Sequence, residues 1–373
     1  MDRLDRAVGA VLGSAAGDAL GAPYEFGPAG ALSARGEEMR GGGGWDPGEA
    51  TDDTQMAVLV GESLLEHGGL ELADVFARFR HWAAWEPKDI GLQTEDVLSS
   101  GAPWDLAAAL HFQVNARAAG NGSLMRAATS AVWFAPAGRG GTMDAARRIA
   151  ALTHGDRAAW EGTAVLHELV RVALDGADPL AALPEVLDAV HPEHRARYAR
   201  VLGPDWHPDL ATEFNGAVWP CLGSAVWALR TTGGFAPAVR AAVDLGGDTD
   251  TVAAVTGALA GAVYGARAIP REWTDPLHVP LPGAGPGHGE GRVGRVPDRV
   301  LDAGALRTLA RRLAGAGPGT GPGVETGPGV ETGPRAETGA GAGTRPRAET
   351  GAGAGTRQGA EPGPRAEAGP GAA

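Results

Sequence analysis

Two short segments rich in carboxylate and hydroxyl groups stand directly before long apolar runs of the sequence. They are Thr51-Asp52-Asp53-Thr54 and Gly246-Gly247-Asp248-Thr249-Asp250-Thr251. A single Thr or Asp is enough to cap a helix, whereas each segment offers several oxygen ligands at one helix entrance. Hard cations such as Mg²⁺ and Mn²⁺ accept these ligands. We therefore interpret the segments as two halves of one metal site, with helix capping as the alternative for either segment alone.

A glycine-rich loop, Gly120-Asn121-Gly122-Ser123, stands before a further apolar run that begins at Leu124. Its two glycines free the backbone to turn N–H groups toward an anion, and the start of a helix adds to that attraction. The loop does not match a dinucleotide fingerprint, because a helical pattern rather than a strand precedes it. A diphosphate cradle fits these residues, and a plain helix–helix turn is the alternative.

Three isolated residues could act beside these segments, although each also has a purely structural explanation. Glu25 and Asp89 each follow a proline by two residues, and His154 stands in a predicted turn. Taken alone, each would be an ordinary loop or turn residue. Three other histidines lie in helical patterns and are expected to be structural: His81, His111 and His167.

Helical spacing dominates the sequence up to about residue 315, and no stretch alternates over the length of a strand. We expect an all-α domain of about a dozen helices at residues 1–315. Gly17 and Gly21 are four residues apart, so they would let a neighbouring helix backbone approach closely. The predicted helices are 2–22, 51–67, 72–85, 94–98, 104–118, 124–134, 143–152, 158–174, 179–190, 194–201, 221–231, 236–243, 249–268 and 301–313.

The last part of the chain has a different composition. From about Pro318 onward it contains no aromatic residue, no Leu and no Ile, and the unit PRAETGAGAGTR occurs twice in succession, at 334–345 and 346–357. A short, apolar-poor period of this kind cannot bury a core, so it does not offset the entropy lost on ordering. We expect residues 316–373 to be a disordered tail rich in Gly, Pro and Ala.

Composition and charge exclude several classes of protein. The formal net charge is −13 over 373 residues without a basic block, so we expect no nucleic-acid partner. The one cysteine, Cys221, excludes an internal disulfide and fits the cytoplasm. Acidic residues near the N-terminus argue against a signal peptide, and the uncharged run 251–266 is too short to span a membrane. We expect a cytoplasmic monomer without a membrane partner.

Taken in order, the motifs of the chain resemble those of the ADP-ribosylglycohydrolase family, the group that includes the dinitrogen-reductase-activating glycohydrolase. The resemblance covers about residues 4–273. The Asp89 motif is similar to one found in the bacterial, arginine-directed branch. The six motifs are Gly17-Asp18-Ala19-Leu20-Gly21 followed by Glu25, Thr51–Thr54, Asp89-Ile90-Gly91 with Thr94, Gly120–Arg126, Thr153-His154, and Gly246–Thr251.

The resemblance implies an all-α fold with a dinuclear metal site, and an enzyme that hydrolyses the bond between C1″ of ADP-ribose and a protein side chain, above all arginine. Such a reaction passes through an oxocarbenium-like transition state. The implied ligands of two Mg²⁺ or Mn²⁺ ions are Thr51, Asp52, Asp53, Asp248, Asp250 and Thr251. The implied substrate contacts are Gly120, Asn121, Gly122, Ser123, Met125, Arg126 and His154. A proton of the attacking water would pass to Glu25, Asp53 or Asp89, and the sequence does not choose among them.

Other functions fit parts of the same pattern. A relative without catalysis would only bind ADP-ribose, and loss of metal ligands would favour it, but all six are present here. The same fold could act on another linkage, such as ADP-ribosyl-serine or a free ADP-ribose derivative. An unrelated metal-dependent phosphohydrolase also uses paired acidic clusters, yet no histidine-rich cluster stands beside these aspartates.

Overall fold

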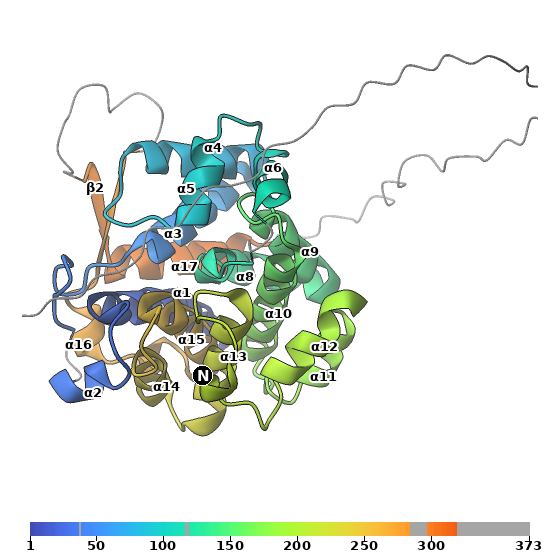
Figure 1. Ribbon diagram of the computed structural model, residues 1–373. Coiled ribbons are helices and arrows are strands. Elements are labelled where there is room, and N and C mark those ends of the chain that lie inside the picture. The colour runs from blue at the N-terminus through green and yellow to red at the C-terminus, as the bar shows by residue number, and fades with distance from the viewer. Residues whose placement is uncertain (37–38, 116–118, 284–296, 319–373) are drawn as a thin grey trace, which may run out of the picture. The chain divides into compact units, whose positions relative to one another are not determined.

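The computed structural model describes residues 1–36, 39–115, 119–283 and 297–318. Met1–Val324 form one compact unit, and a second unit begins at Glu325, beyond the described residues. The predicted tail therefore lies outside the described part of the chain from residue 319 on. Helices predominate within the first unit, which confirms the predicted all-α class (Figure 1).

Most helices lie within a few residues of the predicted ranges. The elements in chain order are α1 (Arg3–Gly21), η1 (Ala22–Tyr24), α2 (Ala31–Arg35), α3 (Asp52–His67), α4 (Leu72–Ala84), α5 (Leu92–Ser99), α6 (Ala107–Val114), α7 (Gly122–Met125), α8 (Ala128–Phe134), η2 (Ala135–Ala137), α9 (Gly138–Ala150), α10 (Arg157–Leu174), α11 (Leu183–Asp188), α12 (Pro192–Val201), η3 (Pro208–Leu210), α13 (Val218–Thr231), α14 (Phe235–Val243), α15 (Thr249–Tyr264), η4 (Ala266–Ala268), α16 (Arg271–Thr274), β1 (His278–Leu281), β2 (Arg299–Asp302) and α17 (Ala303–Ala316).

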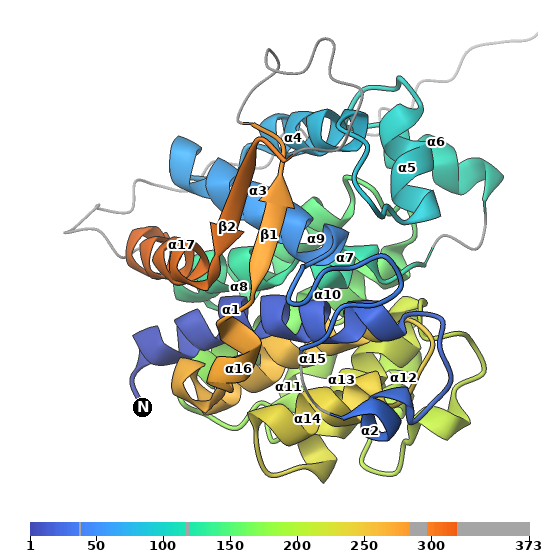
Figure 2. The same cartoon turned by 90° about the vertical axis from the view of Figure 1, so that its left-hand side faces the viewer.

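Helices α1 and α15 lie side by side in the centre of this unit (Figures 1 and 2). A Cβ at Gly17 would stand 2.1 Å from the carbonyl oxygen of Ala253, and one at Gly21 would stand 2.4 Å from that of Thr249. Only glycine permits such contacts, which confirms the close approach predicted for these two positions. The packing is antiparallel, so the C-terminal end of α1 lies beside the first turn of α15.

The described residues also contain one pair of short strands, which the sequence analysis did not identify. Strands β1 and β2 form an antiparallel pair in which His278 faces Asp302 and Leu281 faces Arg299 (Figure 2). Each strand has only four residues, and Pro280 lies within one of them. The segments are therefore too short to show a sustained alternation, and the pair is a small addition to a helical fold.

The predicted helix 124–134 is interrupted. Its start belongs to the single turn α7, Arg126 and Ala127 lie outside any helix, and α8 begins at Ala128. Because α7 has only four residues, it supplies a much weaker dipole than the long helix expected after the glycine-rich loop.

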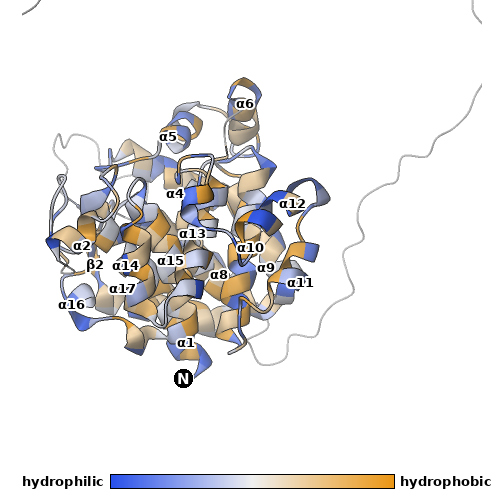
Figure 3. Ribbon diagram, turned by 60° about the horizontal axis from the view of Figure 1, so that its bottom comes forward, coloured by the Kyte–Doolittle hydropathy of each residue, from blue (hydrophilic) through white to orange (hydrophobic). Residues whose placement is uncertain are grey.

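The core of the unit is a continuous cluster of buried apolar residues, with Trp82, Trp133 and Trp273 among its largest side chains. Helices such as α8 and α15 carry mostly hydrophobic residues, whereas α12 is largely hydrophilic (Figure 3). Within the described residues, no helix combines the length and the apolar character that crossing a bilayer requires.

Candidate functional site

The first acidic segment lies at the N-terminus of α3, where Asp18 of α1 holds it in place. Thr51 is the N-cap of α3, and its hydroxyl oxygen accepts a hydrogen bond from the Asp53 backbone N–H at 3.3 Å. The Asp18 carboxylate accepts hydrogen bonds from the backbone N–H groups of Thr51 and Thr54 at 3.0–3.1 Å. It also accepts one from the Thr54 hydroxyl at 2.5 Å. Asp52 and Asp53 are thereby fixed on the first turn of the helix.

The second acidic segment begins α15 after two glycines with positive φ, Gly246 at 71° and Gly247 at 74°. This left-handed backbone is favourable for glycine alone. It turns the chain so that the Asp248 N–H donates to Asn215 Oδ1 at 3.0 Å. The Thr251 hydroxyl donates to Asp53 Oδ1 at 3.2 Å. This last bond joins the two halves of the predicted site, because Asp53 lies on α3 and Thr251 on α15.

Two further predicted carboxylates complete the cluster. Glu25, Asp89 and Asp250 each place one carboxylate oxygen within 4.8 Å of the others. Glu25 follows η1, and Asp89 lies between α4 and α5, so three separate parts of the chain meet at this point. The structure therefore brings together the acidic residues that the sequence analysis had placed in four separate motifs.

Burial makes this cluster electrostatically unfavourable on its own. It raises the pKa of Glu25 to about 8 and that of Asp18 to about 6. Burial and the neighbouring carboxylates raise the pKa values of Asp52, Asp53 and Asp250 well above the usual range. Such groups cannot all be ionised together without a compensating positive charge.

A divalent cation fits this arrangement. Asp53 is 1% exposed, and its Oδ2 has no hydrogen-bond partner among the described residues. A buried carboxylate oxygen without a donor is strongly unfavourable unless a cation balances it. The available oxygens are carboxylates and hydroxyls, as hard divalent ions require. Glu25, Asp89 and Asp250 lie close enough together to hold such an ion. The ligand set expected from the sequence, Thr51, Asp52, Asp53, Asp248, Asp250 and Thr251, stays a prediction.

The glycine-rich loop lies against the acidic cluster. The Asn121 side chain donates to Asp248 Oδ2 at 2.9 Å, which connects the loop to α15. The Ser123 hydroxyl oxygen accepts a hydrogen bond from the Thr163 hydroxyl at 2.8 Å. The loop is therefore held from both sides, by α15 and by α10.

The glycines of the loop were expected to free the backbone for anion binding, but in the structure they make room for a neighbouring side chain. Neither Gly120 nor Gly122 has positive φ, and the Asn121 backbone N–H already donates to the Gly216 carbonyl at 3.0 Å. A Cβ at either glycine would stand 3.4 Å from Nε2 of His154. The missing side chains thus make room for the His154 ring, which brings the loop and the Thr153-His154 motif into contact.

Two predicted substrate contacts lie behind the loop. Arg126 is fully buried, donates to the Thr153 hydroxyl oxygen at 2.7 Å, and has its guanidinium carbon 4.9 Å from the centre of the Phe79 ring. Met125 is 5% exposed and belongs to the core. Neither side chain lies on a surface open to solvent, so each can influence a ligand only through its neighbours.

Sequence reasoning missed two exposed aromatic rings at the edge of the acidic cluster. Phe26 follows Glu25 and is 74% exposed, and Phe214 is 57% exposed. The rings stack with centroids 6.3 Å apart and planes at 19°. The Phe26 N–H donates to the carbonyl of Gly247 at 2.7 Å, which ties the pair to the start of α15. The only sequence signal was the position of Phe26 directly after a predicted catalytic residue.

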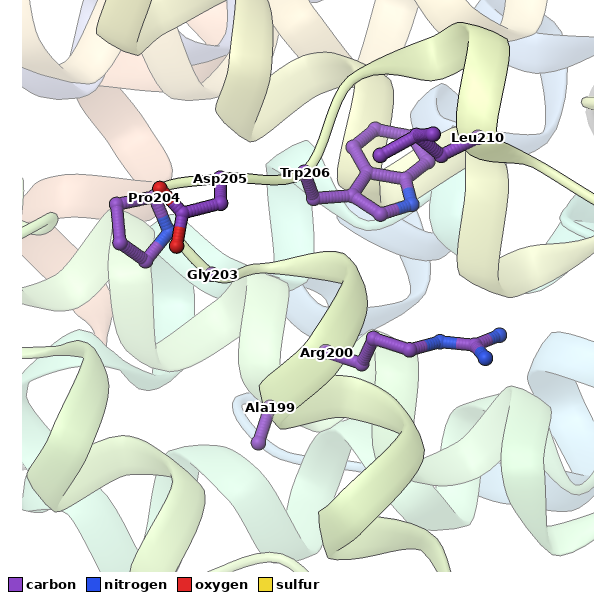
Figure 4. Close-up of a pocket in the computed structure, with 7 residues that line it drawn as sticks. All are labelled: Ala199, Arg200, Gly203, Pro204, Asp205, Trp206 and Leu210. Atoms are coloured by element: carbon purple, nitrogen blue, oxygen red, sulfur yellow. The ribbon is translucent and has the colours of Figure 1, made fainter.

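A hollow of about 460 Å³ lies elsewhere, at the C-terminal end of α12 (Figure 4). Its lining residues are Ala199, Arg200, Gly203, Pro204, Asp205, Trp206 and Leu210. None of the predicted site residues lines it, so this hollow does not belong to the acidic site.

Comparison with known proteins agrees with the motifs. ADP-ribosylarginine hydrolase Tri1 of Serratia proteamaculans (strain 568) is 30% identical over 292 residues, which cover 74% of this chain and 76% of that protein. ADP-ribosyl-[dinitrogen reductase] glycohydrolase of Rhodospirillum rubrum is 30% identical over 282 residues, which cover 74% of this chain and 91% of that protein.

The fold has a counterpart among solved structures as well. A chain described as an ADP-ribosylglycohydrolase-related protein complex superposes with a TM-score of 0.65 at 35% identity, over 84% of this chain and 98% of the other. Residues 1–321 match the family model described as ADP-ribosylglycohydrolase. The chain therefore belongs to the ADP-ribosylglycohydrolase family, whose enzymes hydrolyse ADP-ribose linkages.

Proposed function

We propose that this enzyme removes ADP-ribose from a modified arginine side chain of a protein. In this reaction the bond between C1″ and the arginine nitrogen breaks, and the oxygen of a water forms the new bond to C1″. The observation that carries the proposal is the buried carboxylate cluster between the first turns of α3 and α15, with the glycine-rich loop beside it. The arginine linkage is supported by the name of the Serratia relative.

We assign the six oxygen ligands to two divalent cations, Mg²⁺ or Mn²⁺. When bound, such ions would orient the hydroxyls of the distal ribose and lower the pKa of a water. Thr51, Asp52 and Asp53 would hold them from α3, and Asp248, Asp250 and Thr251 from α15. The Asp18 carboxylate and the Asn121 amide keep these two groups of ligands in register.

The group that accepts the proton of the attacking water has to be a carboxylate that a water can reach. Asp53 is 1% exposed, whereas Glu25 and Asp89 are both partly exposed. We therefore place the proton of the attacking water on Glu25 or Asp89, and give Asp53 to the metal site. Carboxylates this close to C1″ would also stabilise the positive charge that develops there.

The remaining parts of the substrate would lie along the loop and the aromatic pair. We propose that Gly120, Asn121, Gly122 and Ser123, together with His154, line the position of the ribose and diphosphate. The exposed rings of Phe26 and Phe214 offer a flat apolar surface for the adenine base. The buried Cys221 fits a reducing compartment, so we place the reaction in the cytoplasm.

The decisive test is release of free ADP-ribose from an arginine-ADP-ribosylated protein, with Mg²⁺, with Mn²⁺ and with EDTA. We expect metal-dependent release that the Asp250→Asn variant loses. Asp144→Asn is the matched control, because this carboxylate on α9 is 66% exposed and lies outside the site. Release only from serine-modified protein, or binding of ADP-ribose without release, would overturn the arginine proposal.

A further inference from the structure

We infer that Arg126 and Thr153 hold His154 in the neutral tautomer whose Nε2 carries the proton, so that Nε2 acts as a hydrogen-bond donor at the Gly120–Ser123 loop. The identity of the group that accepts this hydrogen bond, an oxygen of the ADP-ribose moiety, rests on the proposed function. The tautomer itself does not, because it follows from the hydrogen bonds within the protein. Arg126 and Thr153 are then positioning residues.

The direction of the first hydrogen bond is fixed by chemistry. Arg126 Nη2 lies 2.7 Å from Thr153 Oγ1 and 3.3 Å from the carbonyl oxygen of Ile149. A guanidinium group has only donors, so the Thr153 oxygen must accept. Both side chains are fully buried, and water does not compete for this contact.

The second hydrogen bond follows from the first. Thr153 Oγ1 lies 2.9 Å from Nδ1 of His154. If Nδ1 carried a proton, the Thr153 oxygen would accept twice, and its own hydrogen would be buried without an acceptor among the described residues. A buried donor without an acceptor is unfavourable. The Thr153 hydroxyl therefore donates to Nδ1, and the proton of the neutral ring is on Nε2.

His154 is also kept neutral. The ring is 1% exposed. Burial first, and then the positive charge of Arg126, lower its pKa well below the usual range. A protonated ring would carry a proton on Nδ1 as well. The Thr153 oxygen would then accept hydrogen bonds from both Arg126 and His154, and its own hydrogen would again have no acceptor among the described residues.

Nε2 faces the loop rather than the protein core. It lies 3.4 Å from the position that a Cβ would take at Gly120, and at the same distance from that at Gly122. No hydrogen bond within the described residues reaches Nε2, although the ring is almost completely buried. A donor in this position suits a phosphate or ribose oxygen, and its direction is set before the ligand arrives.

The tautomer can be read directly by NMR on the full-length protein labelled with ¹⁵N-histidine, with Mg²⁺ present. A His154→Gln variant assigns the resonances. We expect a protonated Nε2 and an unprotonated Nδ1 in the wild type. Thr153→Val, which removes the hydroxyl at nearly constant volume, should shift protonation toward Nδ1, and Thr153→Ser should restore the original pattern. Detection of a proton on Nδ1 in the wild type would overturn the inference.

Kinetics on the ADP-ribosylated protein test the contact with substrate. Thr153→Val should raise KM about tenfold and leave kcat within about twofold, because the lost alignment weakens one hydrogen bond. Thr153→Ser should recover most of the loss. The matched control is Thr129→Val, since Thr129 is equally buried but donates to the Ala57 carbonyl of α3. A changed tautomer with unchanged KM would overturn the role of Nε2 toward substrate.

The two lines of the test separate this inference from the proposed function. A wild-type enzyme that shows the expected tautomer but releases no ADP-ribose contradicts the proposed function. The inferred hydrogen bonds from Arg126 to Thr153 and from Thr153 to His154 then still stand. Release of ADP-ribose together with a protonated Nδ1 supports the proposed function and overturns the inferred tautomer.

Discussion

The stacked pair Phe26 and Phe214 is the feature most open to a test at the level of single residues. Large aromatic rings are normally covered, yet both of these are more than half exposed beside the acidic cluster. Phe26 also has φ of 57°, a left-handed conformation that is unusual for a bulky residue. The bond from its N–H to Gly247 holds that conformation, which indicates that the position of the ring is built into the fold.

Phe214→Ala should therefore weaken substrate binding without affecting the chemistry. Loss of a base-stacking surface costs about 1–3 kcal/mol, so we expect KM to rise roughly tenfold while kcat changes little. Steady-state kinetics on the ADP-ribosylated protein measure both constants. Leu210→Ala, at a side chain that is 60% exposed and outside the site, is the control and should leave KM unchanged. An unchanged KM in Phe214→Ala would show that the base lies elsewhere.

His167 controls stability rather than catalysis. It is fully buried in α10, its Nε2 lies 3.1 Å from the Ser130 hydroxyl, and burial lowers its pKa to about 3. The unfolded chain binds a proton at this ring near pH 6.5, whereas the folded protein does not. The contribution of His167 to stability is therefore complete above about pH 6.5 and is lost as the pH falls below it.

The His167→Gln variant should lose this pH dependence. Between pH 6.5 and 5.5 the free energy of unfolding of the wild type should fall by about 1 kcal/mol more than that of the variant. Urea unfolding at the two pH values measures the difference. Parallel changes in both proteins would mean that His167 is protonated in the folded state, contrary to its burial.

Single residues also show what the sequence could and could not reveal. The carboxylates of the site were identifiable because paired Asp and Thr groups before apolar runs are distinctive. Their partner Asn215 was not identifiable, because it accepts a hydrogen bond from the Asp248 N–H, which is far away in the chain. A hydrogen bond of this kind leaves no local pattern.

At the level of elements, the α1–α15 pair determines where the acidic segments meet. The glycine spacing in α1 indicated a close approach but not its partner, since any helix could have filled that face. The loop-to-helix boundary after Ser123 was less predictable. The apolar run 124–134 continues through Arg126, and the helix is interrupted where that guanidinium is buried beside Thr153.

Two Gly→Ala substitutions should have opposite effects on stability. In Gly257→Ala the new Cβ would stand 2.0 Å from the Gly13 carbonyl oxygen, so the helices must move apart. We expect a loss of about 1–3 kcal/mol or more in the free energy of unfolding. Gly140→Ala on α9 meets no atom within 4 Å and should instead stabilise by about 0.5–1 kcal/mol.

Urea unfolding of the two variants beside the wild type checks the sign of each change. Because both substitutions are made inside helices, a difference in helix propensity cancels between them. Stabilisation by Gly257→Ala would contradict the close packing of α1 against α15. Weakening of metal binding in the same variant would further show that this packing aligns the two halves of the site.

At the scale of the whole molecule, we expect the acidic cluster to oppose folding unless a cation is present. Its carboxylates come from both ends of the described domain and are brought together only when the helices pack. Burial and mutual repulsion then raise their pKa values, so folding without a cation has to take up protons or tolerate repelling charges. A metal bound at the proposed site should for this reason also stabilise the fold.

Removal of the metal should therefore lower Tm, and Asp250→Asn should reverse part of that loss. A cation at about 100 times its Kd adds about 2.7 kcal/mol, so Mg²⁺ should raise the Tm of the EDTA-treated wild type by about 5 °C. Neutralising Asp250 removes a ligand and also relieves repulsion, since its carboxylate lies close to those of Glu25 and Asp89. The variant should thus melt higher than the wild type in EDTA, yet gain little from Mg²⁺. Differential scanning calorimetry measures all four values. If neither Mg²⁺ nor Mn²⁺ changes the Tm of the wild type, the cluster is not a metal site.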